Sequence, residues 1–113
     1  MADRDPSTAR LPSHVEVGAL LRQVQAAGGF AMVLAKGEAD SGALLVVLTD
    51  QGRRSRAWER MPSPDGHRVW TRVREEVAED PGDFADWLKR RQHQDPDLWI
   101  VELDIPEGER FIR

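Results

Sequence analysis

One apolar run constrains the fold of this 113-residue chain more than any other segment: Leu44-Leu45-Val46-Val47-Leu48. Five consecutive apolar residues, two of them β-branched, are typical of a strand that is buried on both faces. Successive side chains of a strand point to opposite faces of a sheet, so both faces of this strand need cover. The run therefore predicts a central strand over residues 43–49.

The segment 14–27 has the pattern of an amphipathic helix, because its apolar residues recur three or four positions apart. Ser13 and Glu16 have the spacing of a capping box, in which the serine hydroxyl accepts from an amide of the first turn. Gly28 follows the last turn, where a glycine commonly ends a helix in the left-handed conformation.

A second helix is predicted over 81–94. Asp80 is placed to cap it, and Pro81 suits the first helical position, where no backbone N–H is needed. Pro96 disfavours helical geometry at the residue before it, so the helix should end near Gln94.

Further strands are predicted at 30–34, 54–61, 67–73, 99–105 and 111–112 from alternation and flanking turn residues. We expect 30–34 and 43–49 to pair as an antiparallel hairpin and to open a four-stranded meander. The resulting fold class is α+β, with a mainly antiparallel sheet of five or six strands and two helices packed on one face. Residues 1–12 are expected to form a flexible leader, and 13–113 a single domain.

Composition excludes several classes of function. The chain has no cysteine, which removes disulfide frameworks, thiolate zinc sites and thiol catalysis. Its net charge of -4 argues against simple electrostatic capture of nucleic acid. No apolar stretch approaches the roughly 20 residues that span a bilayer, and we expect no membrane contact and a cytoplasmic location.

Two segments carry a family resemblance. One is the glycine-flanked acidic stretch Lys36-Gly37-Glu38-Ala39-Asp40-Ser41-Gly42, and the other is Asp95-Pro96-Asp97-Leu98-Trp99 near the C-terminus. In this order, after a helix that ends in Ala-Ala-Gly, they resemble an uncharacterised bacterial family known as domain of unknown function 1491, found mainly in alphaproteobacteria. The resemblance covers about 14–113. It implies a small cytoplasmic α+β domain and brings no activity, cofactor or catalytic residue.

Two groups of polar side chains are candidates for a metal-binding or catalytic site. Glu38 and Asp40 offer oxygen ligands for a divalent cation, but their loop is equally typical of a solvated hairpin turn. His93 and Asp97 have the chemistry of a general base or a zinc ligand set, but they flank a helix end, where such residues commonly stop a helix. We favour the structural reading of both and assign no catalytic residue, no metal ligand and no cofactor.

Arginine and tryptophan concentrate on two neighbouring predicted strands. On these strands one face would carry six residues that we call the Arg/Trp face: Arg54, Arg56, Trp58, Arg60, Trp70 and Arg72. Arg68 and Arg74 could join it by alternation. Such a surface is typical of platforms that stack bases or bind phosphates, and equally of protein interfaces. The alternative is a solvated sheet face whose arginine stems cover the indoles.

Three classes of function remain open. The first is a small non-catalytic binding or adaptor module that uses the Arg/Trp face for a protein partner or for self-association. The second is a nucleic-acid or nucleotide binder that uses the same face, which we do not favour. The third is an enzyme of undefined class acting through Glu38, Asp40, His93 or Asp97.

Overall fold

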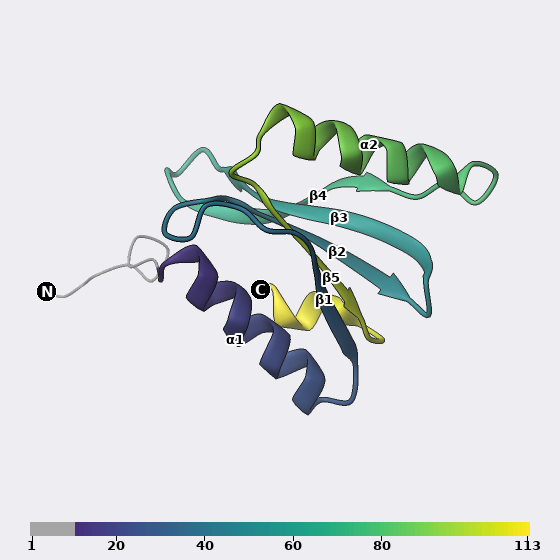
Figure 1. Cartoon of the computed structure of the whole chain (residues 1–113), viewed down its shortest axis with the longest axis horizontal. Helices are drawn as coiled ribbons and strands as arrows, with labels where there is room; N and C mark the ends of the chain where they lie inside the picture. Colours follow the sequence, from purple (N-terminus) through teal and green to yellow (C-terminus); the bar gives the residue numbers. More distant parts are fainter. Residues whose placement is uncertain (1–10) are drawn as a thin grey trace, which may run out of the picture.

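The computed structural model describes residues 11–113 and contains one five-stranded sheet with the strand order β1-β5-β2-β3-β4 (Figure 1). The strands are β1 (Phe30–Ala35), β2 (Leu44–Asp50), β3 (Arg53–Pro62), β4 (Arg68–Glu75) and β5 (Trp99–Asp104). β2 and β5 run parallel, and every other neighbouring pair is antiparallel. The predicted α+β class and mainly antiparallel sheet are confirmed.

The predicted hairpin of β1 and β2 is wrong, because β5 lies between these two strands. The connection between them is no tight turn: it passes over the start of β5, where the Glu38 N–H donates to the Asp97 carbonyl at 3.0 Å. The Trp99 N–H likewise donates to the Ala43 carbonyl at 2.8 Å. The two most buried strands, β2 and β5, thereby lie side by side in the interior of the sheet.

Two glycines allow this connection to lie close to Asp97. A Cβ atom added to Gly37 would lie 2.2 Å from the Asp97 carbonyl oxygen, and one added to Gly42 would lie 2.3 Å from the same oxygen. Any larger residue would push the backbones apart. These glycines serve close approach between backbones, and not the left-handed turn that a hairpin would need.

The two helices cover opposite faces of the sheet, which corrects the expectation that both pack on one face (Figure 1). α1 (Ser13–Ala26) packs its buried Val17, Leu20 and Val24 on one face. α2 (Pro81–Gln94) packs Phe84, Trp87 and Leu88 on the other. The buried strand residues divide between two cores in the same way: Leu44, Val46, Leu48, Val101 and Leu103 face α1, and Leu45, Val47, Ala57 and Ile100 face α2.

The helix boundaries agree with the predictions, but the start of α1 is capped differently. The N-cap residue is Pro12, and Ser13 and Glu16 form no capping box. The Ser13 hydroxyl instead donates to the Gly42 carbonyl at 2.6 Å, and the carbonyls of Ala39 and Asp40 accept the first helical amides. Asp80 caps α2 as predicted, since its side chain accepts from the Asp83 N–H.

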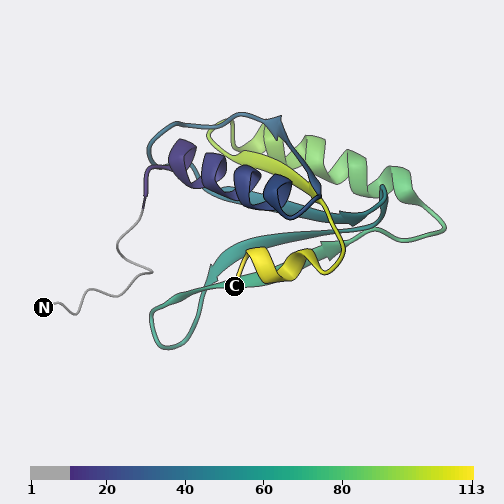
Figure 2. The ribbon, with the colours of Figure 1, turned by 90° about the horizontal axis from the view of Figure 1, so that it is seen from below.

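The C-terminal segment is a short 3-10 helix, η1 (Gly108–Phe111), and the strand predicted at 111–112 is wrong. Figure 2 shows η1 on the same side of the sheet as α1. Ile112 is buried in the α1-side core, and this packing fixes the end of the chain. The expected leader at 1–12 lies, apart from Leu11 and Pro12, outside the described residues.

Candidate binding surface

The pairing of β3 with β4 brings four residues of the Arg/Trp face together. Trp58 lies opposite Arg72, and Arg60 lies opposite Trp70. Directly opposed residues of two strands point to the same face, so all four side chains share one side of the sheet. That side is the α1 side, because both indoles pack against the core that contains Val17, Leu20 and Val24. Both indoles are half-buried, and the Arg72 side chain is 50% exposed.

Two arginines of this face are already engaged by carboxylates. Arg56 donates from Nε and Nη2 to both oxygens of Glu109 in η1, at 2.7 and 3.0 Å. Arg60 donates to Glu16 of α1 at 2.8 Å, and its guanidinium lies 4.7 Å from the centre of the Trp70 ring. These contacts fasten α1 and η1 to β3, and they reduce the positive charge of the surface.

The contact between Arg56 and Glu109 changes the pKa of both side chains. Its side-chain hydrogen bonds hold the pKa of the Glu109 carboxyl below its ordinary value of 4.5 and raise the pKa of Arg56. Burial acts in the opposite sense on each group and is the smaller effect. Both residues are therefore charged at neutral pH, and the Arg56 side chain is only 13% exposed.

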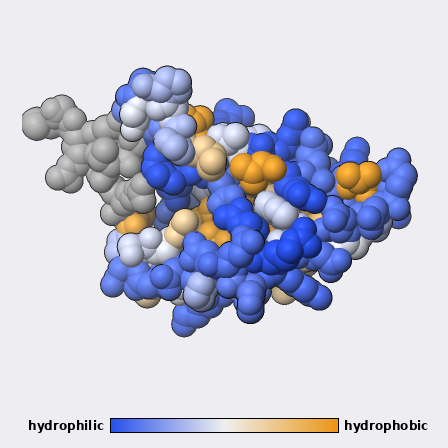
Figure 3. Space-filling model, turned by 90° about the horizontal axis from the view of Figure 1, so that it is seen from above, coloured by the Kyte–Doolittle hydropathy of each residue, from blue (hydrophilic) through white to orange (hydrophobic). Residues whose placement is uncertain are grey.

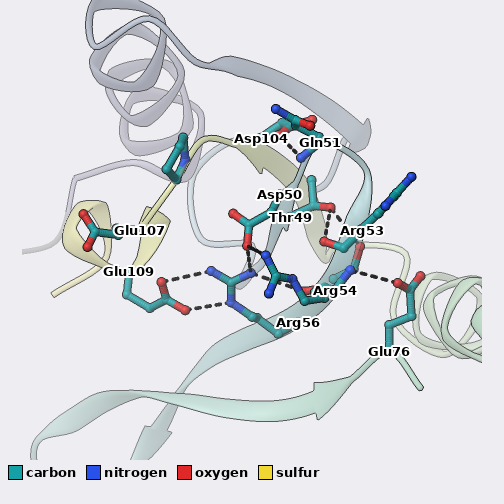
Figure 4. A network of polar contacts seen from close by, with 12 residues as sticks. Thr49, Asp50, Gln51, Arg53, Arg54, Arg56, Glu76, Asp104, Glu107 and Glu109 are labelled. Carbon is teal, nitrogen blue, oxygen red and sulfur yellow. Dashed lines mark hydrogen bonds and ion pairs between the residues drawn. The ribbon is translucent and has the colours of Figure 1, made fainter. Parts of the chain in front are cut away.

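Arg54 lies at the edge of this network, next to Asp50 (Figure 4). Its backbone is left-handed, with φ of 55°, and its amide donates to Glu76 at 3.1 Å. Arg54 and Arg56 both approach the same oxygen of Asp50, at 3.5 and 3.6 Å. The Arg54 side chain is 81% exposed, so it is the most accessible guanidinium of the predicted set.

Arg74 does not join the Arg/Trp face. Ala57 pairs with Arg74 but the next residue, Trp58, pairs with Arg72, so Val73 is an extra residue in a β-bulge. The bulge turns Arg74 toward α2, where it contacts Asp83 at 2.5 Å and lies over Trp87. Simple alternation missed this because a bulge leaves no clear signal in a single sequence.

The indole N–H groups of Trp99 and Trp58 differ in their partners. The Trp99 Nε1 donates to the Glu38 carbonyl at 2.8 Å and ties the loop between β1 and β2 to β5. The Trp58 Nε1 is buried, and no acceptor for it lies among residues 11–113. A buried donor without an acceptor costs about 1–3 kcal/mol. The Arg/Trp face thus includes a polar group that the described fold does not satisfy.

The residues considered for catalysis have structural roles or lie apart. The Glu38 carboxylate accepts from the amides of Asp40 and Ser41 and from the Ser41 hydroxyl, and these bonds hold the pKa of Glu38 below its ordinary value. His93 is exposed on α2, on the opposite side of the sheet from α1. No cluster of three metal-binding side chains occurs within the described part of the chain.

Asp95 caps the turn after α2. Its side chain accepts from the Asp97 amide at 3.1 Å. No helix within residues 11–113 has both the length and the apolar character needed to cross a bilayer.

The surface toward α2 is mainly hydrophilic, with hydrophobic residues in separate small areas (Figure 3).

Together these features define a small α+β domain with a mixed five-stranded sheet and one α-helix on each face. The chain belongs to the DUF1491 family, described as a protein of unknown function, whose family model matches residues 11–113. The resemblance noted from sequence is confirmed.

Three solved structures are similar over most of this chain. A crystal structure of a DUF1491 family protein from Caulobacter crescentus CB15 is 34% identical, with a TM-score of 0.74 over 90% of this chain and 94% of that one. An NMR structure of a DUF1491 family protein from the same organism is 33% identical, with a TM-score of 0.72 over 90% and 92%. The solution structure of protein Atu0922 from A. tumefaciens is 30% identical, with a TM-score of 0.71 over 91% and 92%. A comparison with curated proteins found no match.

Proposed function

We propose that this chain is a small non-catalytic binding module, and that its Arg/Trp face holds a protein partner. The observation that supports this proposal is the position of Trp58 and Trp70, which are half-buried on one side of β3 and β4, directly beside the exposed Arg72. Tryptophan and arginine are the residues most enriched at the energetic centres of protein interfaces. The cytoplasmic location expected from the sequence is part of this proposal.

The chemistry of the surface favours a partner segment with apolar side chains and at least one carboxylate. The indoles are covered in part by the α1-side core and, at Trp70, by Arg60. An aliphatic or aromatic side chain can pack on the apolar area that stays exposed. The Arg72 Nε lies 3.5 Å from Glu75, and both side chains of that pair are at least half exposed. Such an exposed pair contributes little, so Arg72 is free to take a bidentate carboxylate from the partner.

Nucleic acid is the less favoured ligand for this face. Phosphate binding requires guanidinium groups that are free of carboxylates, and its strength grows with the number of such contacts. Arg56 and Arg60 are each held by a glutamate of another element, and the chain as a whole carries a net charge of -4. Only Arg54 and Arg72 of the face remain largely exposed.

Charge reversal at Arg72 tests the proposal. Arg72→Glu removes the cation beside the indoles, and Arg90→Glu makes the same change on exposed α2 and serves as the matched control. We expect proteins captured from the native lysate by wild type and by Arg90→Glu to be lost with Arg72→Glu. The affinity for the captured partner should fall at least tenfold, as measured by titration calorimetry.

Two results would contradict the proposal. One is equal loss of the partner in both variants, because a general charge effect would then explain the binding. The other is binding of single-stranded RNA that weakens steeply with salt and requires Arg72, since phosphate contacts release counterions. The second result would support the nucleic-acid alternative.

A further inference from the structure

The outer edge of β1 is unusually apolar. Among residues 11–113, nine large hydrophobic residues are exposed, and four of them belong to this one strand: Phe30 (78%), Met32 (54%), Val33 (36%) and Leu34 (42%). β1 pairs with β5 on one side only, so its other side presents backbone amides and carbonyls that no described strand accepts. An exposed apolar edge of this kind is a template for another strand.

The opposite edge of the same sheet is protected. β4 carries four charged residues, Arg68, Arg72, Arg74 and Glu75, and a bulge at Val73 interrupts its pairing. Charges and bulges are the usual means by which an edge strand avoids pairing with other chains. β1 contains a register shift near Leu34 but no charged residue in its six positions. One edge is therefore closed to pairing, and the other is open.

We propose that β1 pairs antiparallel with β1 of a second copy of this chain, so that two sheets join into one continuous sheet across a two-fold axis. The unpaired backbone groups of an edge strand can be paired along their whole length by another extended strand. A two-fold axis places the same surface of each copy in contact with itself, so the surface must be complementary to itself. This site is separate from the Arg/Trp face.

β1 meets that requirement in two ways. Its six residues are all uncharged and apolar, so antiparallel pairing places apolar side chains opposite apolar side chains without opposing like charges. Antiparallel pairing also brings the Lys36 end of one strand toward the Phe30 end of the other. Phe30 is paired with Asp104 of β5, so a cation of each copy approaches an anion of its mate.

The test is the mass of the full chain in solution, measured by sedimentation equilibrium from micromolar to millimolar concentration. We expect the wild type to approach twice the chain mass of 12.8 kDa. Met32→Lys places a charge on the open edge and should return the mass to that of one chain. Val69→Lys is the matched control, because Val69 is 50% exposed on the protected edge β4 and its variant should remain a dimer.

Phe30→Lys is a second variant at the open edge, and Phe30 is 78% exposed, so its replacement removes little packing within the chain. Circular dichroism and thermal unfolding establish that each variant is folded. A wild type that has the mass of one chain at every concentration overturns the proposal, and so does dissociation of the Val69→Lys control. Persistence of the dimer in both open-edge variants also overturns it.

Discussion

Different interactions stabilise the two halves of the sheet. One half consists of β1, β5 and β2, and the other consists of β3 and β4. In the first half, β2 and β5 contribute apolar residues to both cores, and their fully buried side chains include Leu45, Leu48, Val101 and Leu103. In the second half, ion pairs connect the hairpin to three other elements: Arg56 to Glu109, Arg60 to Glu16, Arg91 to Glu59 and Arg74 to Asp83. Burial of apolar area fixes the first half, and charge-assisted hydrogen bonds position the second.

This difference bears on function. Ion pairs of partly exposed groups contribute modestly to stability, yet they orient side chains well when they are bidentate. Replacing some ion pairs of the β3–β4 half with contacts to a partner would therefore cost little free energy of folding. β2 and β5 cannot exchange contacts in this way, because their apolar side chains are almost completely buried.

The largest expected effect on stability comes from a substitution in β2, which belongs to the first half of the sheet. Leu45 is fully buried against α2, and Leu45→Ala should lower the free energy of unfolding by about 2–5 kcal/mol through lost burial and a residual cavity. Denaturant unfolding measures this change. A loss comparable with that of an exposed substitution would show that apolar burial does not dominate this half.

The next effect compares the stability lost on replacing Trp99, whose indole N–H is hydrogen-bonded, with that lost on replacing Trp58, whose indole N–H has no described acceptor. Trp99→Phe removes the donor to the Glu38 carbonyl, whereas Trp58→Phe removes a buried donor that has no described acceptor. We expect Trp99→Phe to be the more destabilising of the two by about 1–2 kcal/mol. Equal losses in denaturant unfolding would mean that the Trp58 N–H has an acceptor after all, such as a bound water.

The smallest effect is expected at the Arg56–Glu109 pair. Glu109→Gln should cost about 1 kcal/mol at neutral pH, because the carboxylate is 41% exposed and solvent screens the pair. The folded state lowers the pKa of Glu109, so its stabilisation is present above the ordinary value of 4.5 and is lost as pH falls through the lowered pKa.

The difference in stability between wild type and Glu109→Gln should therefore shrink toward zero in acid. Thermal unfolding across a pH series measures it, and Glu107→Gln, an exposed change next to η1, is the control. A difference that does not depend on pH would contradict the role given to this pair.

Local signals in the sequence predicted the elements well, because they reflect local backbone preferences. Gly28 ends α1 in the left-handed conformation, Asp80 caps α2, and alternation marks β5. The run 44–48 is apolar on both faces and requires cover on both sides, and the structure places one helix on each. The prediction of two helices on one face did not take this requirement into account and is wrong.

What the sequence did not predict depends on contacts between distant residues. The insertion of β5 between β1 and β2 depends on the close approach of Gly37 and Gly42 to Asp97. No local sequence pattern predicts this contact, because the residues are far apart in the sequence. The grouping of Trp58 with Trp70 was predicted from alternation, and the ion pairs of Arg56 and Arg60 with α1 and η1 were not. Their binding role stays a prediction.

The position of β5 has a consequence for how the chain is made. Among the described strands β5 is the last to be synthesised, yet it is the one that pairs with β1, and β2 needs it on one side. Until residues 99–104 emerge, the nascent chain holds a β2–β3–β4 meander and an isolated β1 strand. Such long-range pairing delays folding, so removal of even the final strand should leave a chain that chaperones must hold.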